Sequence, residues 1–486
     1  MNIYIPIEVK VRELEGRTLL ALAAAERGHQ VIIGSKKETL LSAVNGDLPP
    51  GIVHMKSLTP SEQMLEQLTK MRSMGHFVTS QDEESGLLDE SYEKFAKIRY
   101  SEESIKLASG VFGWGEHDVD CLQKVYPSEA NKIIATGSPR VDFWRPDFEK
   151  YFHQDSKIEQ WKDKPYLLVV SNFGSVIRSN KIWNVMARLR EAGYFDRDPE
   201  MELFEYEYSG YMLQLIGHFV KMIRKVAETY PDVNILIRPH PVEAEDAWDK
   251  MIGSYPNVHV FREGTISSWI RGATGIIHNG CTSALEAAVS GVPRIAYRPI
   301  PSSFEREIPN QLSREAFTMD ELLEKVDHLL NQTSSKAEIQ HDKEADQKLR
   351  QRLVNVNGAL AADRIVDYWE TIGSKNQLNN NPIDNYSPVS NTVSGRKVVQ
   401  NASMVRKIRI IASNLKQLLT EFGKNSGDGT PIRDDGQLLD NSFKFNSYSD
   451  AEFEHILSNL QQSLDRFHNI KYKRISNRAF LITSSK

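Results

Sequence analysis

The sequence predicts an α/β protein with two Rossmann-like domains, because short β-branched runs alternate with amphipathic stretches along most of its 486 residues. The first unit is a strand over 3–7, a helix over 13–27 and a strand over 31–34, which have the length of a parallel crossover connection. A polar segment over 149–164 separates this half from a second alternating half, which begins with the strand 166–170. A chain of this length needs more than one core.

Four segments are expected along the chain. The first domain covers 1–148, and the second covers 149–372. Residues 373–401 are rich in Asn, Ser and Pro and nearly lack aromatic side chains, which is typical of a flexible linker. Residues 402–486 are expected to form a small α+β extension that attaches at the periphery of the molecule.

Composition and charge exclude several functional classes. The 60 basic and 65 acidic side chains give a net charge of −5, which offers no overall field for nucleic acid. Cys121 and Cys281 lack metal-like spacing, so neither a disulfide framework nor a zinc site is indicated. No metal ion and no cofactor are expected. No apolar run reaches the roughly 18 residues that span a bilayer, and the first residues lack a signal-peptide pattern. We therefore expect a cytoplasmic protein whose membrane contact would be peripheral, at the inner face of the membrane.

Two strands of the second domain are expected to end in polar side chains. The strand 235–237 stops at Arg238-Pro239-His240-Pro241, where two prolines bracket a histidine. The strand 166–170 ends likewise at Ser171 and Asn172. A lone His-Pro pair is usually only a loop, but ligands of open α/β sheets bind at this edge of the sheet.

A third strand of the second domain, over 275–278, is followed by a turn and a helix. Asn279-Gly280 makes the turn, Thr282 and Ser283 form a hydroxyl pair, and Ser283-x-x-Glu286 opens the helix. Such a box alone is usually a helix cap. Because backbone N–H groups and the helix dipole favour an anion at this position, the turn is also a candidate phosphate site.

The first domain carries an acidic trio after its strand 76–79. Asp82, Glu83 and Glu84 precede Gly86, which allows the chain to turn. A solvated loop is the more common interpretation of such a trio. As chemistry, closely set carboxylates raise one another's pKa, which can leave one of them poised as a general base.

Together these motifs resemble the bacterial surface carbohydrate biosynthesis protein family. The resemblance rests on 2–14, the acidic trio 82–84, the stretch Gly137-Ser138-Pro139-Arg140-Val141-Asp142, the motif 238–241 and the hydroxyl pair 282–283, within about residues 1–372. The family is similar in its motifs to sialyltransferases and Kdo transferases of the GT-B fold, in which two Rossmann-like domains face each other across a cleft. The transferase motif has glycine directly after its acids, whereas here Ser85 intervenes, which leaves open which acid acts.

The resemblance implies a metal-independent glycosyltransferase that takes a nucleotide-activated sugar, for example a CMP-linked ulosonic acid, as co-substrate. Its acceptor would be a glycan or lipid-linked glycan of lipopolysaccharide or capsule. Asp82, Glu83 or Glu84 would be the acid or base, and His240 would act on the donor phosphate. The implied donor-binding residues are Arg238, Pro241, Ser171, Asn172, Gly280, Thr282, Ser283 and Glu286, and the implied donor-sugar or acceptor residues are Arg12, Glu13 and Arg140.

Three other functions remain open at this point. A CDP-polyol phosphotransferase would use comparable His and Ser/Thr contacts, and a sugar-nucleotide epimerase would need acids and a histidine but no acceptor groove. A non-catalytic scaffold for envelope assembly would fit the linker and the extension. Within the extension, Arg406, Arg409 and Lys416 would suit an anionic membrane, whereas a cap that packs on the cleft would need Leu418, Leu419 and Phe422 buried.

Overall fold

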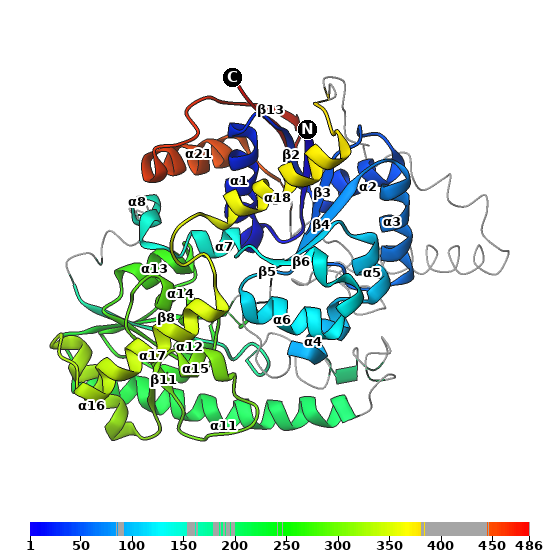
Figure 1. The fold of residues 1–486 in the computed structure, drawn as a ribbon. Helices are drawn as coiled ribbons and strands as arrows, with labels where there is room; N and C mark the ends of the chain where they lie inside the picture. Colours follow the sequence, from blue (N-terminus) through cyan, green and yellow to red (C-terminus); the bar gives the residue numbers. More distant parts are fainter. Residues whose placement is uncertain are drawn as a thin grey trace, which may run out of the picture.

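The computed structural model describes residues 1–83, 85, 92–152, 161, 164–177, 184, 186–187, 190, 195, 200–240, 242–244, 246–380, 383, 445 and 447–485. It confirms the α/β fold, with one domain built on an eight-stranded sheet and the other on a six-stranded sheet (Figure 1). Among the predicted site residues, Glu84 and Pro241 lie outside the described residues, as does the predicted helix around Arg406.

The sheet of the first domain has the strand order β13-β14-β2-β1-β3-β4-β5-β6. Strands β1 to β6 pair in parallel, whereas β14 pairs with β2 and with β13 in antiparallel fashion. The order 2-1-3-4-5 is that of a doubly wound sheet whose direction of winding reverses between β1 and β3. The strands are β1 Asn2–Ile7, β2 Gln30–Ser35, β3 Ile52–Met55, β4 Phe77–Gln81, β5 Gly110–Gly113, β6 Ile133–Ala135, β13 Ile470–Ser476 and β14 Ala479–Ser484.

Helices cover both faces of this sheet because side chains alternate along its strands. Ile3 and Ile5 of β1 pack with α1, α18 and α21 on one face, whereas Tyr4 packs with helices α2 to α6 on the other. The helices of this domain are α1 Lys10–Glu26, α2 Lys36–Asn45, α3 Glu62–Ser73, α4 Tyr92–Arg99, α5 Glu102–Leu107, α6 Glu116–Val125, α7 Pro139–Asp142 and α8 Glu149–Phe152, with α18 Ala361–Asn376 and α21 Asp450–Leu464 from the end of the chain.

The sheet of the second domain is parallel throughout, in the order β12-β11-β10-β7-β8-β9. This is the Rossmann order, and its winding reverses between β7 and β10. Helices α11, α12 and α16 cover one face, and α13 and α14 cover the other. The elements are β7 Tyr166–Val170, β8 Asn234–Arg238, β9 Val258–Val260, β10 Gly275–His278, β11 Arg294–Tyr297, β12 Arg314–Ala316, α11 Glu200–Thr229, α12 Ala247–Ile252, α13 Ile266–Gly272, α14 Ser283–Val289, α15 Glu307–Gln311, α16 Met319–Leu330 and α17 Lys336–Arg352.

After α17 the chain breaks and returns to the first domain, where α18 follows. Asn355 lies in the break, where its side-chain amide donates to the Ser138 carbonyl at 3.1 Å and to Asp142 at 2.6 Å. The Asp142 carboxylate also accepts from the backbone N–H groups of Ala361 and Ala362, at the beginning of α18. Trp369 of α18 is then fully buried in the core of the first domain.

The sequence predicts that the C-terminal extension attaches at the periphery, and this prediction is wrong. Residues 447–485 complete the core of the first domain. Phe453 of α21 and Phe480 of β14 are fully buried there. A Cβ atom on Gly34 of β2 would lie 2.5 Å from Ala479, so glycine is required for β14 to approach. Composition indicates a polar linker but carries no signal for the pairing of strands that are far apart in sequence, so it predicts a separate extension. None of the described helices is long and apolar enough to cross a membrane.

An apolar cluster joins the two domains. Trp114 and Trp144 of the first domain pack with Leu285 and Val289 of α14. Beside this cluster the guanidinium of Arg271 donates to the backbone carbonyls of residues 143 and 145 at 2.9 Å each, and it lies over the ring of Phe152. The contact therefore fixes α13 and α14 against the segment that connects the domains.

Candidate functional site

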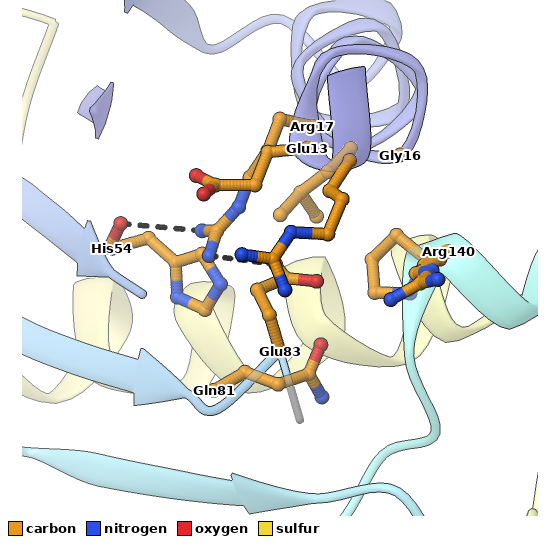
Figure 2. A pocket seen from close by; sticks show the side chains of 10 residues that line it. Glu13, Gly16, Arg17, His54, Gln81, Glu83 and Arg140 are labelled. Atoms are coloured by element: carbon orange, nitrogen blue, oxygen red, sulfur yellow. Dashed lines mark hydrogen bonds and ion pairs between the residues drawn. The ribbon is translucent and has the colours of Figure 1, made fainter. Parts of the chain in front are cut away.

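A charged pocket lies at the C-terminal edge of the first sheet, next to the reversal between β1 and β3. Figure 2 shows guanidinium and carboxyl groups from α1, α7 and the end of β4 converging on it. Its cavity volume is about 10 Å³, which is about the space that one water molecule occupies, within about 220 Å³ of open space at its mouth. Four of the predicted residues meet here although their motifs are far apart in sequence. The pocket is lined by Arg12, Glu13, Gly16, Arg17, Leu20, His54, Gln81, Glu83, Pro139 and Arg140.

Glu83 is the carboxylate at the centre of this pocket. It is only 7% exposed, and its Oε1 accepts from Nη2 of Arg17 at 3.0 Å. Burial raises the pKa of Glu83 above its usual value, while the positive charges of Arg17 and Arg140 act against this rise. The solvated loop that is the common interpretation of an acidic trio does not describe this residue.

Asp82 is also buried, but it faces away from the pocket lining. Its carboxylate pairs with Arg99, at 2.7 and 2.8 Å from two guanidinium nitrogens. Its backbone carbonyl accepts from the indole N–H of Trp114 at 2.8 Å. Two consecutive acids of the trio are thus held by different arginines, and of these two only Glu83 lines the pocket.

Glu13 holds the loop between β1 and α1. Its two carboxylate oxygens accept from the backbone N–H groups of Glu8 and Val9 at 3.0 and 2.9 Å, and the Nζ of Lys56 lies 3.5 Å away. These contacts satisfy N–H groups at the beginning of the helix that have no partner within it. The structure therefore gives Glu13 a role in shaping the wall of the pocket.

Arg140 reaches the pocket because α1 and α7 approach each other closely. A Cβ atom on Gly16 would lie 3.0 Å from the Arg140 backbone nitrogen, so this crossing requires a residue without a side chain. The guanidinium lies 5.5 Å from the ring centroid of Trp144. Its charge acts on Glu83 in the first domain and on Glu286 in the second.

The carboxyl groups of Glu15 and Glu286 interact electrostatically at the junction of the two domains. Burial raises the pKa of Glu15 to about 7, a hydrogen bond from the Tyr151 hydroxyl at 2.9 Å opposes this rise, and the charge of Glu286 adds to it. Burial also raises the pKa of Glu286, opposed by Ser267 and by the charges of Arg140 and Arg271. Glu286 has one buried oxygen, Oε1, for which the structure gives no hydrogen-bond partner. Helix α14 begins after Thr282 without a side-chain cap, so the expected Ser283-x-x-Glu286 capping box is not formed.

The residues predicted at the end of β8 differ in their exposure and partners. The guanidinium of Arg238 donates to the backbone carbonyls of Glu263 and Gly264 at 2.7 Å each, so it holds the loop after β9. His240 is exposed, and its Nδ1 accepts from the backbone N–H of Val242 at 3.3 Å. Of these two side chains, His240 is the one that faces solvent at this edge of the sheet.

A buried glutamate that the sequence did not suggest, Glu243, organises the ends of β7 and β8. Its carboxylate accepts from the Ser171 hydroxyl at 2.6 Å, from the Phe173 N–H at 2.8 Å and from the Trp248 indole N–H at 2.9 Å. Ser171 therefore serves first to anchor this loop, while the neighbouring Asn172 is half-buried. Both residues follow β7, at the reversal of the second sheet.

The turn after β10 lies at the same reversal. Gly280 has a φ of 83°, a left-handed conformation that favours glycine, and its N–H donates to Nδ1 of His278 at 2.9 Å. Burial lowers the pKa of His278 to about 3, so this ring is neutral and structural. Helix α14 begins directly after the turn, and the side chains of Thr282 and Ser283 are half-buried at its first residues.

Sequence reasoning missed the three other polar side chains of the first pocket, which belong to Arg17, His54 and Gln81. Arg17 follows Glu13 by one helical turn inside an otherwise apolar helix face, which is the signal that could have revealed it. His54 and Gln81 interrupt strands that are otherwise suited to burial. Within the described part of the chain, no group of three or more His, Cys, Asp or Glu side chains is arranged to hold a metal ion.

No protein-family model matches the chain, and neither does any curated protein. Among solved structures, the fold is similar to UDP-GlcNAc 2-epimerase from Neisseria meningitidis, with 13% identity and a TM-score of 0.48 over 76% of this chain and 100% of that one. It is also similar to UDP-GlcNAc 2-epimerase from Methanocaldococcus jannaschii, with 14% identity and a TM-score of 0.47 over 76% and 100%. The wall teichoic acid polymerase TagF gives 11% identity and a TM-score of 0.38 over 68% and 73%. Likenesses this distant leave the function to be argued from the residues themselves.

Proposed function

We propose that the chain is an enzyme that transfers a sugar from a nucleotide-activated donor to a hydroxyl group of a surface glycan. The observation that carries the proposal is Glu83: a buried carboxylate with a raised pKa, in a charged pocket at the C-terminal edge of a doubly wound sheet. Such a group suits general base catalysis near neutral pH.

The donor is proposed to bind at the reversal of the second sheet, between the ends of β7 and β10. Gly280 leaves room for a close approach, and the hydroxyls of Thr282 and Ser283 are suited to hydrogen bonds with phosphate oxygens. Asn172 and Glu286 are proposed as further donor contacts. The exposed His240, at the end of the neighbouring strand, is proposed to stabilise charge on the departing phosphate.

In the proposed reaction Glu83 removes the proton from the acceptor hydroxyl as the hydroxyl oxygen attacks the anomeric carbon. The bond between that carbon and the phosphate oxygen breaks, and the nucleotide leaves with the electron pair. Arg12 and Arg140 line the same pocket, and guanidinium groups bind carboxylates in two-point fashion. A CMP-linked ulosonic acid, which carries a carboxylate, is therefore the donor to test first.

The test is a panel of CMP-, CDP- and UDP-activated sugars and polyols, scored for nucleotide release and for the product. Release of the nucleotide together with a new glycosidic bond supports the proposal. Transfer of a polyol phosphate from a CDP donor identifies a phosphotransferase instead. An activated sugar that returns with one inverted centre and its nucleotide still attached identifies an epimerase, and either of these two results overturns the transferase proposal.

Peripheral contact with a membrane that carries lipid-linked acceptors stays a prediction.

A further inference from the structure

We propose that Arg17 is the positioning residue of the pocket, which holds the Glu83 carboxylate ionised and fixed at the end of β4 so that it can act as a base. The kinetic consequences of this proposal rest on the proposed function. The charge state and orientation of Glu83 are independent of that function, because they follow from contacts within the protein alone.

The first support is geometric. Arg17 is 3% exposed, and one guanidinium nitrogen donates to the His54 carbonyl of β3 at 3.3 Å while another reaches Glu83 at 3.0 Å. His54 is itself fixed, because its Nδ1 lies 3.0 Å from the Thr79 hydroxyl and its ring packs edge-on against Trp369. The guanidinium is therefore anchored to the sheet on one side and presents its other side to the carboxylate (Figure 2).

The second support is the contrast between neighbouring acids. Asp82 is equally buried and also has an arginine partner, Arg99, but neither residue lines the pocket. The side chain of Arg99 is 24% exposed, compared with 3% for that of Arg17. Two adjacent acids thus each pair with an arginine, and only the pair with the more deeply buried arginine lines the pocket.

The third support is the balance of charges around Glu83. Negative charge comes from Glu13 on α1 and from Asp82, and positive charge comes from Arg17 and from Arg140 on α7. Lys56 partly neutralises Glu13. Removing Arg17 would leave a buried carboxylate beside two other acids and only one of its two opposing cations, so the carboxylate should take up a proton at a higher pH.

The experiment follows Glu83 directly, in full-length protein labelled with ¹³C at glutamate side-chain carboxyls. The Glu83 resonance is assigned by its loss in Glu83→Gln and then titrated in the wild type, Arg17→Gln and Arg17→Lys. We expect the midpoint to rise by on the order of 1–3 pH units in Arg17→Gln and by less in Arg17→Lys, which keeps the charge. The matched control Arg99→Gln removes the partner of Asp82, which acts on Glu83 only through its charge, and should shift the Glu83 midpoint much less than Arg17→Gln does.

The kinetic arm measures the acid limb of the pH–rate profile for nucleotide release. It should shift upward with the Glu83 midpoint in both Arg17 variants. Unchanged midpoints in both variants, or lower turnover at every pH without a shift of the limb, would reduce Arg17 to a structural residue and overturn the proposal. If Arg17→Gln does not fold, Arg17→Lys provides both readouts. A shifted midpoint in a protein that turns over none of the donors sustains the role of Arg17 and removes the transferase assignment.

Discussion

The two sheet edges of this protein use polar residues in different ways. At the edge of the first sheet, Arg17 and Glu83 are buried together in one pocket and bind each other. At the edge of the second sheet, Arg238 and Ser171 are held by groups of their own domain, while His240 is exposed. The first edge therefore holds a charged pair in the protein interior, whereas the second presents an exposed imidazole to solvent.

This difference matters because proton transfer and phosphate binding make different demands on polar side chains, although the sequence motifs at the two edges look similar. A group that moves a proton benefits from burial, because burial moves its pKa toward neutrality. Groups that bind a phosphate need only donors and open space, because the ligand brings its own charge. We therefore expect substitutions at the first edge to change pH dependence and those at the second edge to change donor use.

The largest effect is expected from truncation after Tyr386, which removes α21, β13 and β14. The loss of buried Phe453 and Phe480 exposes the core behind α1, so the first domain should unfold and its pocket should be lost, while the second sheet keeps all its strands. Circular dichroism melts and limited proteolysis would test this. Lys473→Ala, an exposed change on β13, is the control. A truncated protein with the wild-type melting profile would contradict the assignment of this segment to the core.

Glu83→Gln should lower the rate of nucleotide release by about 10²- to 10⁴-fold, because the base is lost while the shape of the side chain is kept. The matched variant at the other edge, Glu243→Gln, removes a buried carboxylate that anchors a loop and should have a much smaller effect on the rate. Steady-state kinetics on both variants make the comparison. Equal losses would mean that the two edges do not differ in the way proposed.

Asp142→Ala tests the segment through which the chain returns from the second domain to the first. Its carboxylate is fully buried and accepts from Asn355 and from two N–H groups of α18, and burial raises its pKa to about 6. Removing it leaves these donors without an acceptor, so the free energy of unfolding should fall by about 2–4 kcal/mol. Urea denaturation followed by tryptophan fluorescence measures the change. A loss below about 0.5 kcal/mol would show that water replaces the carboxylate.

His240→Ala should reduce turnover of the correct donor by roughly 100-fold with little change in stability, because the side chain is exposed. Donor kinetics and a thermal melt on the same preparation separate the two effects. Nucleotide release at the wild-type rate would return His240 to the status of a loop residue and weaken the phosphate site of the second edge.

The smallest effect is expected from Glu15→Gln, and it depends on pH. The pKa of Glu15 is about 7 in the folded protein and 4.5 is its ordinary value, so the folded state holds this proton more tightly. The contribution of Glu15 to the free energy of unfolding is therefore fully present below pH 4.5, and it is lost as the pH rises through about 7. Because the side chain keeps some contact with water, we expect Glu15→Gln to be about 2 kcal/mol more stable than the wild type at pH 8 and equal to it at pH 4. Denaturation at both pH values tests this, and a difference that does not change with pH would contradict it.

The sequence predicted the local structure well because the signals were local. Apolar runs predicted the central strands of both sheets, and the position after a strand predicted Glu83, whereas Arg12 and Arg140 came from the family resemblance. The fold brings these three residues together. Arg17 was missed because it lies inside a helix, where a charged residue is usually on the solvent side. Its burial becomes visible only when the helix is placed against the ends of β3 and β4.

The remaining errors concern contacts between distant parts of the chain. The return of α18 to the first domain depends on Asp142, and the register of β14 depends on Gly34, and neither dependence leaves a local pattern. The partners of Arg238 could not be foreseen for the same reason, since backbone carbonyls from a following loop carry no sequence signature. Hydrophobic periodicity predicts which elements form but not which of them meet.

The antiparallel pairing of β14 with β2 has a consequence for how the protein folds as it is synthesised. Strand β2 is among the first parts of the chain to be synthesised, and its partner β14 is among the last. The first sheet therefore cannot complete its edge until nearly all of the described chain has left the ribosome. The strands of the second sheet all lie between residues 166 and 316, so that sheet can close earlier. Since contacts between distant segments slow folding, the domain that begins first should finish last, with the unpaired edge of β2 exposed to other chains in the meantime.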